Sequence, residues 1–523
     1  MVLKSRKNIA GFVHPGAIKM NKYVNAPDCI SFTDCQKNNF KLSPSLYAKF
    51  AMKNNCSKPV SEFLSRKLSN SDLGIEIGSL SYIDKSTHYF LRTKALQEHS
   101  FIPQISRESA LSMRPADFEN MNLKKGDLLI SKDSNIGEIV ILDKDYPYYM
   151  PSSAIYRLPV ENKWKYYLLA MLKHDVFREQ LDAVVPKGAT IRHAKTMFLN
   201  CLIPLPKKNE KKIVEFVSIL TKAIVEKEIL IQKRYEKALN LIENELQKNQ
   251  KKETFFYRFP MYSEIIESKR LDASLYSEYF QKEIFKIKNY KNGSRNIYEL
   301  GYDLSRGQNL QISNIGHSIY ATEHEKNFYT LMLPKFLSKY GTIEKIEYLG
   351  NKNFLKTLKQ GDLIFGAEGF EKGRSIVVLE EQDKVITNIH GITIQHLEND
   401  INLSIFVKLF LDYLRKKGLI DLYAVGGNGG SLAKKYWDSI PFPVFPKEKQ
   451  LEIVRMYHNC ACVYNYGKFT LDNFIAEDSL TNASAGIYEL DKSLKHLKGI
   501  LNKTIEKIVD DEDVKIDFVG NNA

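Results

Sequence analysis

The sequence lacks long apolar runs, secretory features and any regular cysteine pattern. No run of about 18 uncharged apolar residues occurs, and no apolar stretch follows the basic residues of the first ten positions, so neither a membrane span nor a secretion signal is predicted. The 6 cysteines among 523 residues form no C-x2-C pair and have no histidines at zinc-finger spacing, so no metal site is predicted. Scattered cysteines without a secretion signal indicate reduced thiols and a cytoplasmic location.

Motifs of independent catalysis are also missing. A DNA methyltransferase that works alone needs a Gly-rich cofactor loop and an Asn/Asp-Pro-Pro-Tyr/Phe motif, but Asp145-Tyr146-Pro147-Tyr148 has tyrosine in the first proline position. The glycines of 426–430 lack the Gly-Lys-Ser/Thr ending of a phosphate loop, and no H-E-x-x-H or Ser/His/Asp set is recognisable. No catalytic residue is therefore predicted. The carboxylates of a nuclease need no recognisable motif, so a self-contained DNA endonuclease or modification enzyme stays open as the alternative.

The sequence contains the same ordered set of short segments in each of its two halves. Three segments of the first half return in the second half, namely 42–47 as 271–276, 123–130 as 358–365, and 203–206 as 440–443. Tyr47 lies 229 residues before Tyr276, Gly126 lies 235 before Gly361, and Pro204 lies 237 before Pro441. Three landmarks in one order at nearly one offset predict a tandem duplication of a domain-sized unit. We call the two repeats copy one and copy two.

Both copies are predicted to mix strands and helices. In each copy a Gly-Asp pair precedes two short apolar runs with a polar, glycine-containing loop between them, which is typical of a β-hairpin. The loops are 131–137 in copy one and 366–373 in copy two. Apolar residues at three-to-four spacing then predict helical segments near 164–181 and 405–422. The fold class is therefore α/β (mixed α+β) in two globular pseudo-repeats.

Long helices are predicted after both copies. Residues 207–252 contain no Gly or Pro and form a helix of roughly 40 residues, about 60 Å long at 1.5 Å per residue. Its apolar stripe consists of Ile213, Val217, Leu220, Ile224, Ile231, Ala238 and Ile242. A comparable region after copy two, broken near 482–486, ends in a heptad seam of Ile487, Leu490, Leu494, Leu497, Leu501 and Ile508. We expect the two helices to form an antiparallel coiled-coil-like pair; packing of each against its domain is the alternative.

The charge balance favours an anionic partner. The chain has 76 Lys and Arg against 62 Asp and Glu, a net charge of +14. Such a surplus is typical of proteins that bind nucleic acid, because cations near phosphates release condensed counterions. A lysine-rich surface that only maintains solubility is the alternative. A bivalent protein-binding scaffold is a third reading of a duplicated chain, and it predicts little dependence of binding on salt.

The ordered set of motifs resembles the specificity (S) subunit of type I DNA restriction–modification systems. The signals are Arg270-Leu271-Asp272-Ala273 with Tyr276, both Gly-Asp segments, both Ile-Pro-x-Pro exits, and Lys449-Gln450 with Ile453 at a helix start. The resemblance covers about residues 40–508. Copy one departs from the pattern, since Lys41-Leu42-Ser43-Pro44 stands where Arg-Leu-Asp-Ala is expected and the helix start at 210–213 lacks the usual Gln.

The resemblance implies a non-catalytic DNA-binding subunit active in phage defence and DNA methylation. Each copy would be a target recognition domain that reads one half of a bipartite target in double-stranded DNA. The helices would set the spacing and dock two methyltransferase (M) subunits, which bind S-adenosylmethionine; restriction (R) subunits with ATP and Mg could join, and this chain would carry no cofactor. The implied division is 1–207 first target recognition domain (its first 20 to 40 residues unassigned), 208–252 spacer helix, 253–445 second target recognition domain, 446–509 C-terminal helical spacer and 510–523 acidic tail.

Candidate DNA contacts lie in two kinds of loop. Glycine-rich segments precede each exit, where glycine permits close approach of backbone to phosphate and Lys or Arg adds charge. Their candidates are Lys187, Gly188, Thr190, Arg192 and Lys195 in copy one, and Asn428, Gly430, Ser431, Lys434 and Lys435 in copy two. The hairpin loops offer side chains of base-reading types, namely Lys132, Asn135, Lys372 and Arg374. Ordinary turns and hairpin caps are the alternatives.

Overall fold

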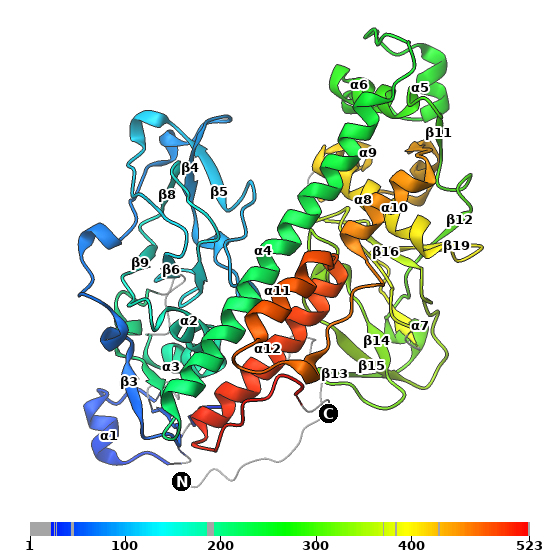
Figure 1. Cartoon of the computed structure of the whole chain (residues 1–523). Coiled ribbons are helices and arrows are strands. Elements are labelled where there is room, and N and C mark those ends of the chain that lie inside the picture. The colour runs from blue at the N-terminus through cyan, green and yellow to red at the C-terminus, as the bar shows by residue number, and fades with distance from the viewer. Residues whose placement is uncertain are drawn as a thin grey trace. The chain divides into compact units, whose positions relative to one another are not determined.

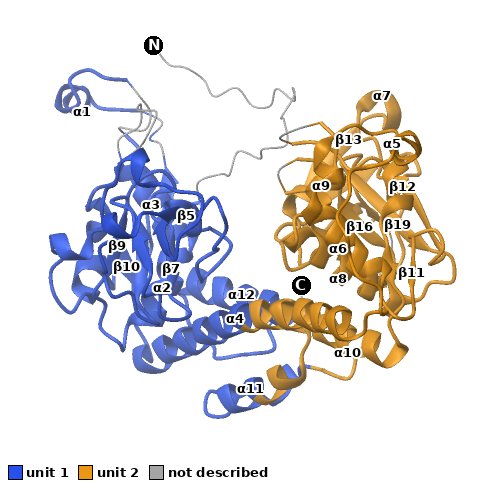
Figure 2. Ribbon diagram, turned by 90° about the horizontal axis from the view of Figure 1, so that it is seen from above, with its two compact units in different colours: residues 1–229, 464–479, 493–523 blue, residues 230–463, 480–492 orange. Residues whose placement is uncertain are grey.

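The computed structural model describes residues 22–25, 27, 29–42, 47–185, 193–369, 371–381, 384–426 and 429–520. The chain divides into two compact units (Figure 2). Unit 1 comprises residues 1–229, 464–479 and 493–523, and unit 2 comprises residues 230–463 and 480–492. Copy one lies in unit 1 and copy two in unit 2, so the duplication in the sequence corresponds to two separately packed bodies.

Two three-stranded sheets form the frame of the described part of unit 1 (Figure 1). In the first, β4 (His88–Leu91) lies between antiparallel β5 (Ala110–Met113) and parallel β8 (Tyr149–Pro151). Half of the residues in β4 and β5 are only partly buried, so this sheet is less completely covered than the second sheet of the unit.

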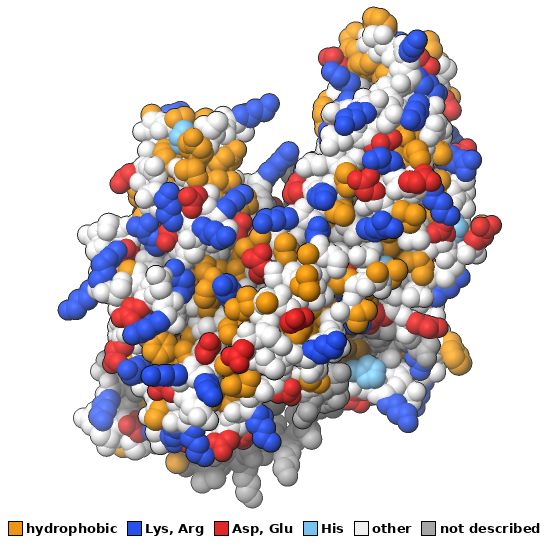
Figure 3. Space-filling view, viewed as in Figure 1, with side chains coloured by type: hydrophobic (Ala, Val, Ile, Leu, Met, Phe, Trp, Pro, Cys, Tyr) orange, Lys and Arg blue, Asp and Glu red, His pale blue; other side chains and the backbone are white. Residues whose placement is uncertain are grey.

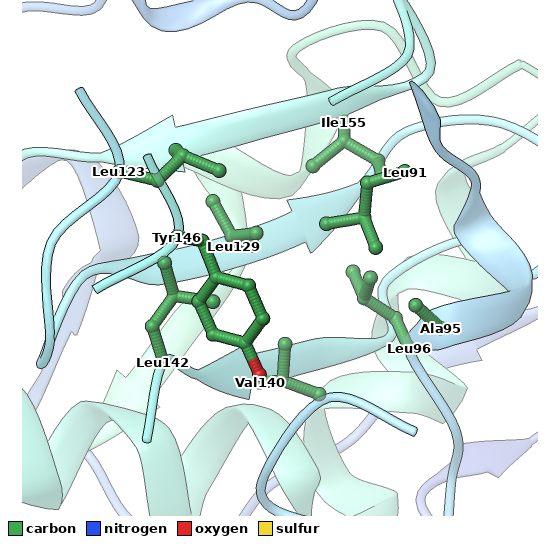
Figure 4. Close-up of a cluster of buried hydrophobic side chains, with 9 residues drawn as sticks. All are labelled: Leu91, Ala95, Leu96, Leu123, Leu129, Val140, Leu142, Tyr146 and Ile155. Carbon is green, nitrogen blue, oxygen red and sulfur yellow. The ribbon is translucent and has the colours of Figure 1, made fainter. Parts of the chain in front are cut away.

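The second sheet of unit 1 carries the predicted hairpin. Its central strand β6 (Leu128–Ser131) pairs antiparallel with β7 (Ile139–Ile141) and with β9 (Ile155–Leu158). All residues of β6 and β7 are buried, which explains why both segments read as unbroken apolar runs. Figure 4 shows Leu129 and Val140 of this sheet pointing into one core cluster. The hairpin prediction is confirmed.

Unit 2 repeats this hairpin in a wider sheet. Its strands run in the order β12 (Tyr302–Arg306), β19 (Gly391–His396), β16 (Leu363–Gly366) and β17 (Ser375–Val377), and all pairs are antiparallel. A second four-stranded sheet has the order β13, β15, β14, β18, with the bounds Ser318–Ala321, Glu347–Asn351, Tyr329–Leu331 and Val385–Ile386. Its β14–β18 pair is parallel, as is the β4–β8 pair of unit 1.

The repeated Gly-Asp pair forms the same turn in both units. Gly126 and Gly361 have φ of 86° and 91°, a backbone conformation that glycine adopts without a steric penalty. The carboxylate of the following residue, Asp127 or Asp362, accepts a hydrogen bond of 2.9 Å from the backbone N–H three residues earlier. This requirement for a left-handed residue followed by a capping carboxylate explains why the motif recurs unchanged.

Both exits from the copies are short strands. In unit 1, β10 (Leu202–Pro204) pairs antiparallel with β3 (Ser57–Pro59); in unit 2, β20 (Phe442–Pro443) pairs antiparallel with β11 (Ser294–Arg295). The start of each copy is also alike. The Tyr47 hydroxyl donates to the Lys41 carbonyl at 2.6 Å, and the Tyr276 hydroxyl donates to the Arg270 carbonyl at 2.8 Å. Further elements are β1 (Val24–Asn25), α1 (Phe32–Lys37), β2 (Lys49–Phe50), α5 (Tyr262–Ser268), α6 (Glu278–Lys288) and α7 (Ile312–Ile315).

The helical segments predicted inside each copy exist, but each is broken in two. In copy one, α2 (Lys165–Lys173) and α3 (Asp175–Val184) are separated by extended His174, whose Nδ1 accepts from the N–H of Val176 and so caps α3. In copy two, α8 (Ile401–Lys416) and α9 (Leu419–Tyr423) are separated at Gly418, whose φ of 73° ends the helix. The helical prediction is therefore confirmed in both copies, but the two breaks were not predicted, because each apolar pattern continues across its cap.

The long helix after copy one is α4 (Glu210–Lys248), and the last helix is α12 (Ile487–Val509) (Figure 1). Every predicted seam residue is at most 6% exposed, namely Ile213, Val217, Leu220, Ile224, Ile231, Leu490, Leu494, Leu497 and Leu501. Within unit 1, Glu228 of α4 pairs with Lys498 of α12 at 3.0 Å. Within unit 2, Arg234 Nε donates to the Ala485 carbonyl at 3.1 Å, just before α12 begins. From Glu228 to Arg234 the residue numbers on α4 increase, while those of the residues they contact decrease from Lys498 to Ala485. The two segments therefore run in opposite directions, and the predicted antiparallel pairing is confirmed.

The C-terminal region differs from α4 because it forms several helices. They are α10 (Lys447–Tyr457), α11 (Phe474–Ser484) and α12, so the break predicted near 482–486 is confirmed but a second, between α10 and α11, was not predicted. The break between α11 and α12 requires Gly486, where a Cβ would lie 2.7 Å from the backbone of Tyr457. The Glu489 carboxylate then accepts from the Gly486 N–H at 2.9 Å and starts α12.

The acidic tail is held against unit 1. Its carboxylates are mostly exposed, as predicted, but Asp510 pairs with Lys53 at 3.2 Å and Asp513 pairs with Lys208 at 3.0 Å. Beyond them Phe518 is only 2% exposed, with its ring 4.4 Å from that of Phe474. The tail is therefore not detached from the unit, because one aromatic side chain beyond the acidic residues packs into an apolar cluster. Among the described residues, no helix has both the length and the apolarity needed to cross a membrane.

Candidate nucleic-acid interface

In unit 1 the loop after β6 meets the segment that precedes the exit. The N–H of Ala194 donates to the Lys132 carbonyl at 2.8 Å, and Asp133 and His193 form an antiparallel bridge. Lys195, next along the chain, is exposed and adopts a φ of 47°. The two loop types that the sequence selected separately therefore form one surface in this unit.

The corresponding loops also meet in unit 2. Val425 and Ser431, which lie on either side of the glycine-rich segment, form an antiparallel bridge. The N–H of Gly369, in the loop after β16, donates to the Gly429 carbonyl at 3.3 Å. Arg306, at the end of β12, reaches the same place and donates from Nη2 to Ser431 Oγ at 3.4 Å. The same pair of loops is thus brought together in both copies.

Five of the ten predicted phosphate contacts lie within the described residues. Lys187, Gly188, Thr190, Arg192 and Asn428 lie outside the described residues. Lys195, Lys434 and Lys435 are exposed, as a phosphate contact requires, and the Lys435 ammonium lies 4.9 Å from the centre of the Tyr436 ring. Gly430 is buried and Ser431 is half-buried. These five described positions remain candidates.

Three of the four predicted base-reading side chains are turned into the protein instead. The Asn135 amide donates to the carbonyls of Thr93 and Leu96 at 3.0 and 2.6 Å. Lys372 is 8% exposed and pairs with Asp421 at 2.8 Å. These contacts fix the loops, which agrees with the hairpin-capping alternative.

Arg374 has the same fixing role in unit 2 as Asn135 in unit 1. Its Nη1 donates to the Leu337 carbonyl at 2.8 Å, and Glu371 pairs with the same guanidinium. Burial lowers the pKa of Arg374. Lys132, the fourth candidate, is half-buried and pairs with Asp133 at 2.8 Å.

The fold brings further polar residues to these loops that were not predicted from the sequence. They are Asp133 and His193 in unit 1, and Arg306, Glu368 and His390 in unit 2. The carboxylates carry a signal that could have been found, because Asp133 and Glu368 each lie seven residues after the glycine of their Gly-Asp pair. The histidines carry no such signal, since they come from different elements.

The charge of the molecule is spread rather than concentrated on the face that Figure 3 shows, where Lys and Arg side chains alternate with acidic and hydrophobic ones. Within the described ranges, no group of three His, Cys, Asp or Glu side chains is arranged to hold a metal ion. The loops that meet in each unit offer polar and cationic side chains at the surface, among them Lys195, Lys434 and Lys435.

Comparison with known proteins gives one family and several solved structures. Residues 75–232 match the family model described as "Type I restriction modification DNA specificity domain". No curated protein gives a significant match. The chain is similar to the S subunit of a type I restriction–modification system from M. genitalium, with 13% identity over 89% of this chain and 99% of that chain and a TM-score of 0.40.

A second solved structure, the HsdS subunit from Thermoanaerobacter tengcongensis, is 13% identical over 87% of this chain and 96% of that chain, with a TM-score of 0.25. The matched residues include strands β4 to β9, helices α2 and α3 and the N-terminal part of α4. The Gly-Asp turn and the exit strand of copy one lie within them. Residues 75–232 of the chain are therefore similar to the type I restriction–modification DNA specificity domain.

Proposed function

We propose that the chain is the non-catalytic DNA-recognition subunit of a type I restriction–modification complex and that each unit reads one half of a bipartite target. The observation that carries this is the repetition of one loop arrangement, in which the loop after the Gly-Asp strand meets the segment before the exit in both units. Two such surfaces on one chain suit two short base clusters in one duplex. Each surface also has exposed lysines for phosphate contacts, Lys195 in unit 1 and Lys434 and Lys435 in unit 2.

The spacer role rests on α4. This helix begins in unit 1 and ends in unit 2, and its 39 residues correspond to about 58 Å at 1.5 Å per residue. A continuous helix that α12 contacts over part of its length resists bending better than a loop would. We propose that this pair of helices sets the spacing of the half-sites and docks two methyltransferase subunits. S-adenosylmethionine would bind to those subunits, and ATP and Mg to restriction subunits where present.

The test is to purify the chain alone and together with a methyltransferase subunit. The chain alone should methylate no DNA, and the complex should methylate a split sequence that genome-wide methylation mapping identifies. Methylation by the isolated chain would contradict the proposed division of labour. Cleavage of DNA by the isolated chain with Mg²⁺, lost on changing one Asp or Glu, would instead support a self-contained nuclease.

Salt dependence separates DNA binding from a protein-binding scaffold. For DNA binding, the logarithm of the association constant should fall with the logarithm of salt concentration, by about 0.9 per phosphate neutralised. Changing Lys434 and Lys435 together to Gln should reduce this slope by up to about 2 if both lysines contact phosphates. A slope near zero for the unchanged complex would refute the DNA-binding role.

A further inference from the structure

A carboxylate occupies the same position of the repeat in both units. Asp133 follows Gly126 by seven residues, and Glu368 follows Gly361 by seven residues. Each lies just beyond a fully buried strand, β6 or β16, in the loop that meets the segment before the exit. The sequence around them differs, so the shared feature is the carboxylate rather than the loop as a whole.

In unit 1 the Asp133 carboxylate bridges a cation and an imidazole. Its Oδ1 lies 2.6 Å from Nδ1 of His193, and its Oδ2 lies 2.8 Å from Nζ of Lys132. The Asp133 side chain is only 14% exposed, whereas the His193 side chain is 57% exposed. The carboxylate is therefore shielded and the imidazole faces outward.

In unit 2 the Glu368 carboxylate makes the same two contacts. Its Oε2 lies 2.6 Å from Nδ1 of His390, and its Oε1 lies 3.0 Å from Nη1 of Arg306. The exposed fractions are 34% for the Glu368 side chain and 60% for the His390 side chain. Again the carboxylate is the more shielded partner.

The two imidazoles do not come from equivalent positions. His193 precedes the exit of copy one, whereas His390 lies in the turn between β18 and β19 of copy two. The residue 235 positions after His193 is Asn428, so duplication of the sequence does not explain the second histidine. The same trio of cation, carboxylate and imidazole is therefore assembled twice from different elements, which points to a shared role at this place in the fold.

In both histidines Nδ1 contacts the carboxylate, so Nε2 is the ring nitrogen that can bind a partner outside the protein. An ionised carboxylate can only accept hydrogen bonds, so Nδ1 must carry the hydrogen that it donates. In the neutral ring Nε2 is then an acceptor of fixed direction, because the carboxylate fixes both the tautomer and the orientation of the imidazole. An acceptor in this position suits the exocyclic amino group of adenine or cytosine in the major groove.

We propose that His193 and His390 each contact one base of one half-site, and that Asp133 and Glu368 act as positioning residues for them. This proposal rests on the proposed DNA-recognition function and adds the specificity-determining side chains. The cations Lys132 and Arg306 hold the far oxygen of each carboxylate and so keep it from rotating away.

The experiment uses the whole chain in complex with its methyltransferase partner. His193→Leu and His390→Leu are compared by mapping methylated sites in a random DNA library. Each change should relax discrimination at one base pair by about 5- to 140-fold, and only in the half-site of its own unit. Each variant is thus the control for the other. His324→Leu, at an exposed histidine between β13 and β14 whose ring contacts Tyr348, should change neither half-site.

The positioning role has its own measurement. In a chain labelled with ¹⁵N at its 11 histidines, the His390 ring should show the Nδ1–H tautomer in the unchanged protein and a mixture of tautomers in Glu368→Gln. Asp133→Asn should have the same effect on His193 and none on His390.

The outcomes are distinguishable. Unchanged discrimination at both half-sites in the histidine variants would overturn the proposal, as would an equal loss at both half-sites. A variant that loses non-specific DNA affinity together with its unfolding transition would show that the trio only supports the loop. An unchanged complex that binds no DNA would instead refute the proposed function itself.

Discussion

Removal of the Asp412 carboxylate should destabilise unit 2 by about 3–5 kcal/mol. The Lys408 ammonium is fully buried on α8, with Asp412 Oδ2 at 2.7 Å and the Tyr340 carbonyl at 3.1 Å. Its Nζ also lies 4.3 Å from the centre of the Tyr457 ring. In Asp412→Leu the ammonium would keep one neutral acceptor and an aromatic face but no counter-charge, and a buried charge without a partner is what makes such changes costly.

The reverse change should cost less. In Lys408→Met the Asp412 carboxylate keeps Arg415, whose Nη2 lies 3.7 Å away, so part of its charge remains compensated. The double variant Lys408→Met, Asp412→Leu exchanges a buried ion pair for apolar side chains of similar size. Its unfolding free energy should lie within about 1 kcal/mol of the unchanged protein or above it. The three variants together form a double-mutant cycle.

The two tryptophans allow each unit to be followed separately. Trp437 is fully buried in unit 2, with its ring 4.9 Å from that of Phe365, and Trp164 lies in unit 1. In a Trp164→Phe background, urea unfolding followed by Trp437 fluorescence reports on unit 2 alone. Lys173→Met, which removes the buried lysine at the equivalent position of unit 1, is the matched control and should leave this transition unchanged. Single variants that cost under about 1 kcal/mol, or a double variant as unstable as their sum, would refute the reasoning.

Three further changes test unit 1 through Trp164 in a Trp437→Phe background. Burial lowers the pKa of Lys173 from 10.5 to about 8. Between pH 8 and 10.5 the unfolded chain therefore binds a proton that the folded chain has released, so the free energy of unfolding should rise with pH across this interval. This rise should be absent in Lys173→Met. Leu497→Ala, at a fully buried seam position, should lower the free energy of unfolding by about 2–5 kcal/mol. Asn502→Ala, on the exposed face of α12, should change it by less than about 0.5 kcal/mol. Equal losses in the two variants would contradict the seam. Phe518→Ala should cost about 3–5 kcal/mol in urea unfolding and make the tail accessible to protease; unchanged stability would mean that the tail does not support the unit.

The parts of the fold that follow local rules were predictable. The Gly-Asp turn depends on a left-handed φ at Gly126 and Gly361 and on a capping carboxylate one residue later, so it is legible in the sequence. The helices α4 and α12 were predictable because their buried residues recur at helical spacing along one stripe. The breaks at His174 and Gly418 were missed because the apolar pattern runs through both caps.

The candidate site was predictable as two loops, but not as a set of side chains. Asn135, Lys372 and Arg374 have the residue types that read bases, yet the fold offers each of them a partner inside the protein. Lys372 turned inward because Asp421, distant in the sequence, lies 2.8 Å away. Conversely, His193 and His390 meet their carboxylates only after the chain has folded back on itself.

The sequence by itself determined the duplication, the turn and exit of each copy, and the apolar stripes of the two long helices. These features depend on backbone geometry and on periodicity, which act between residues close in the chain. Only the tertiary structure decided which polar side chains face outward, that α10 and α11 are separate helices and that the tail packs on unit 1. A hydrogen bond or an ion pair forms with whatever group the fold brings within about 3 Å, and no local pattern encodes that distance.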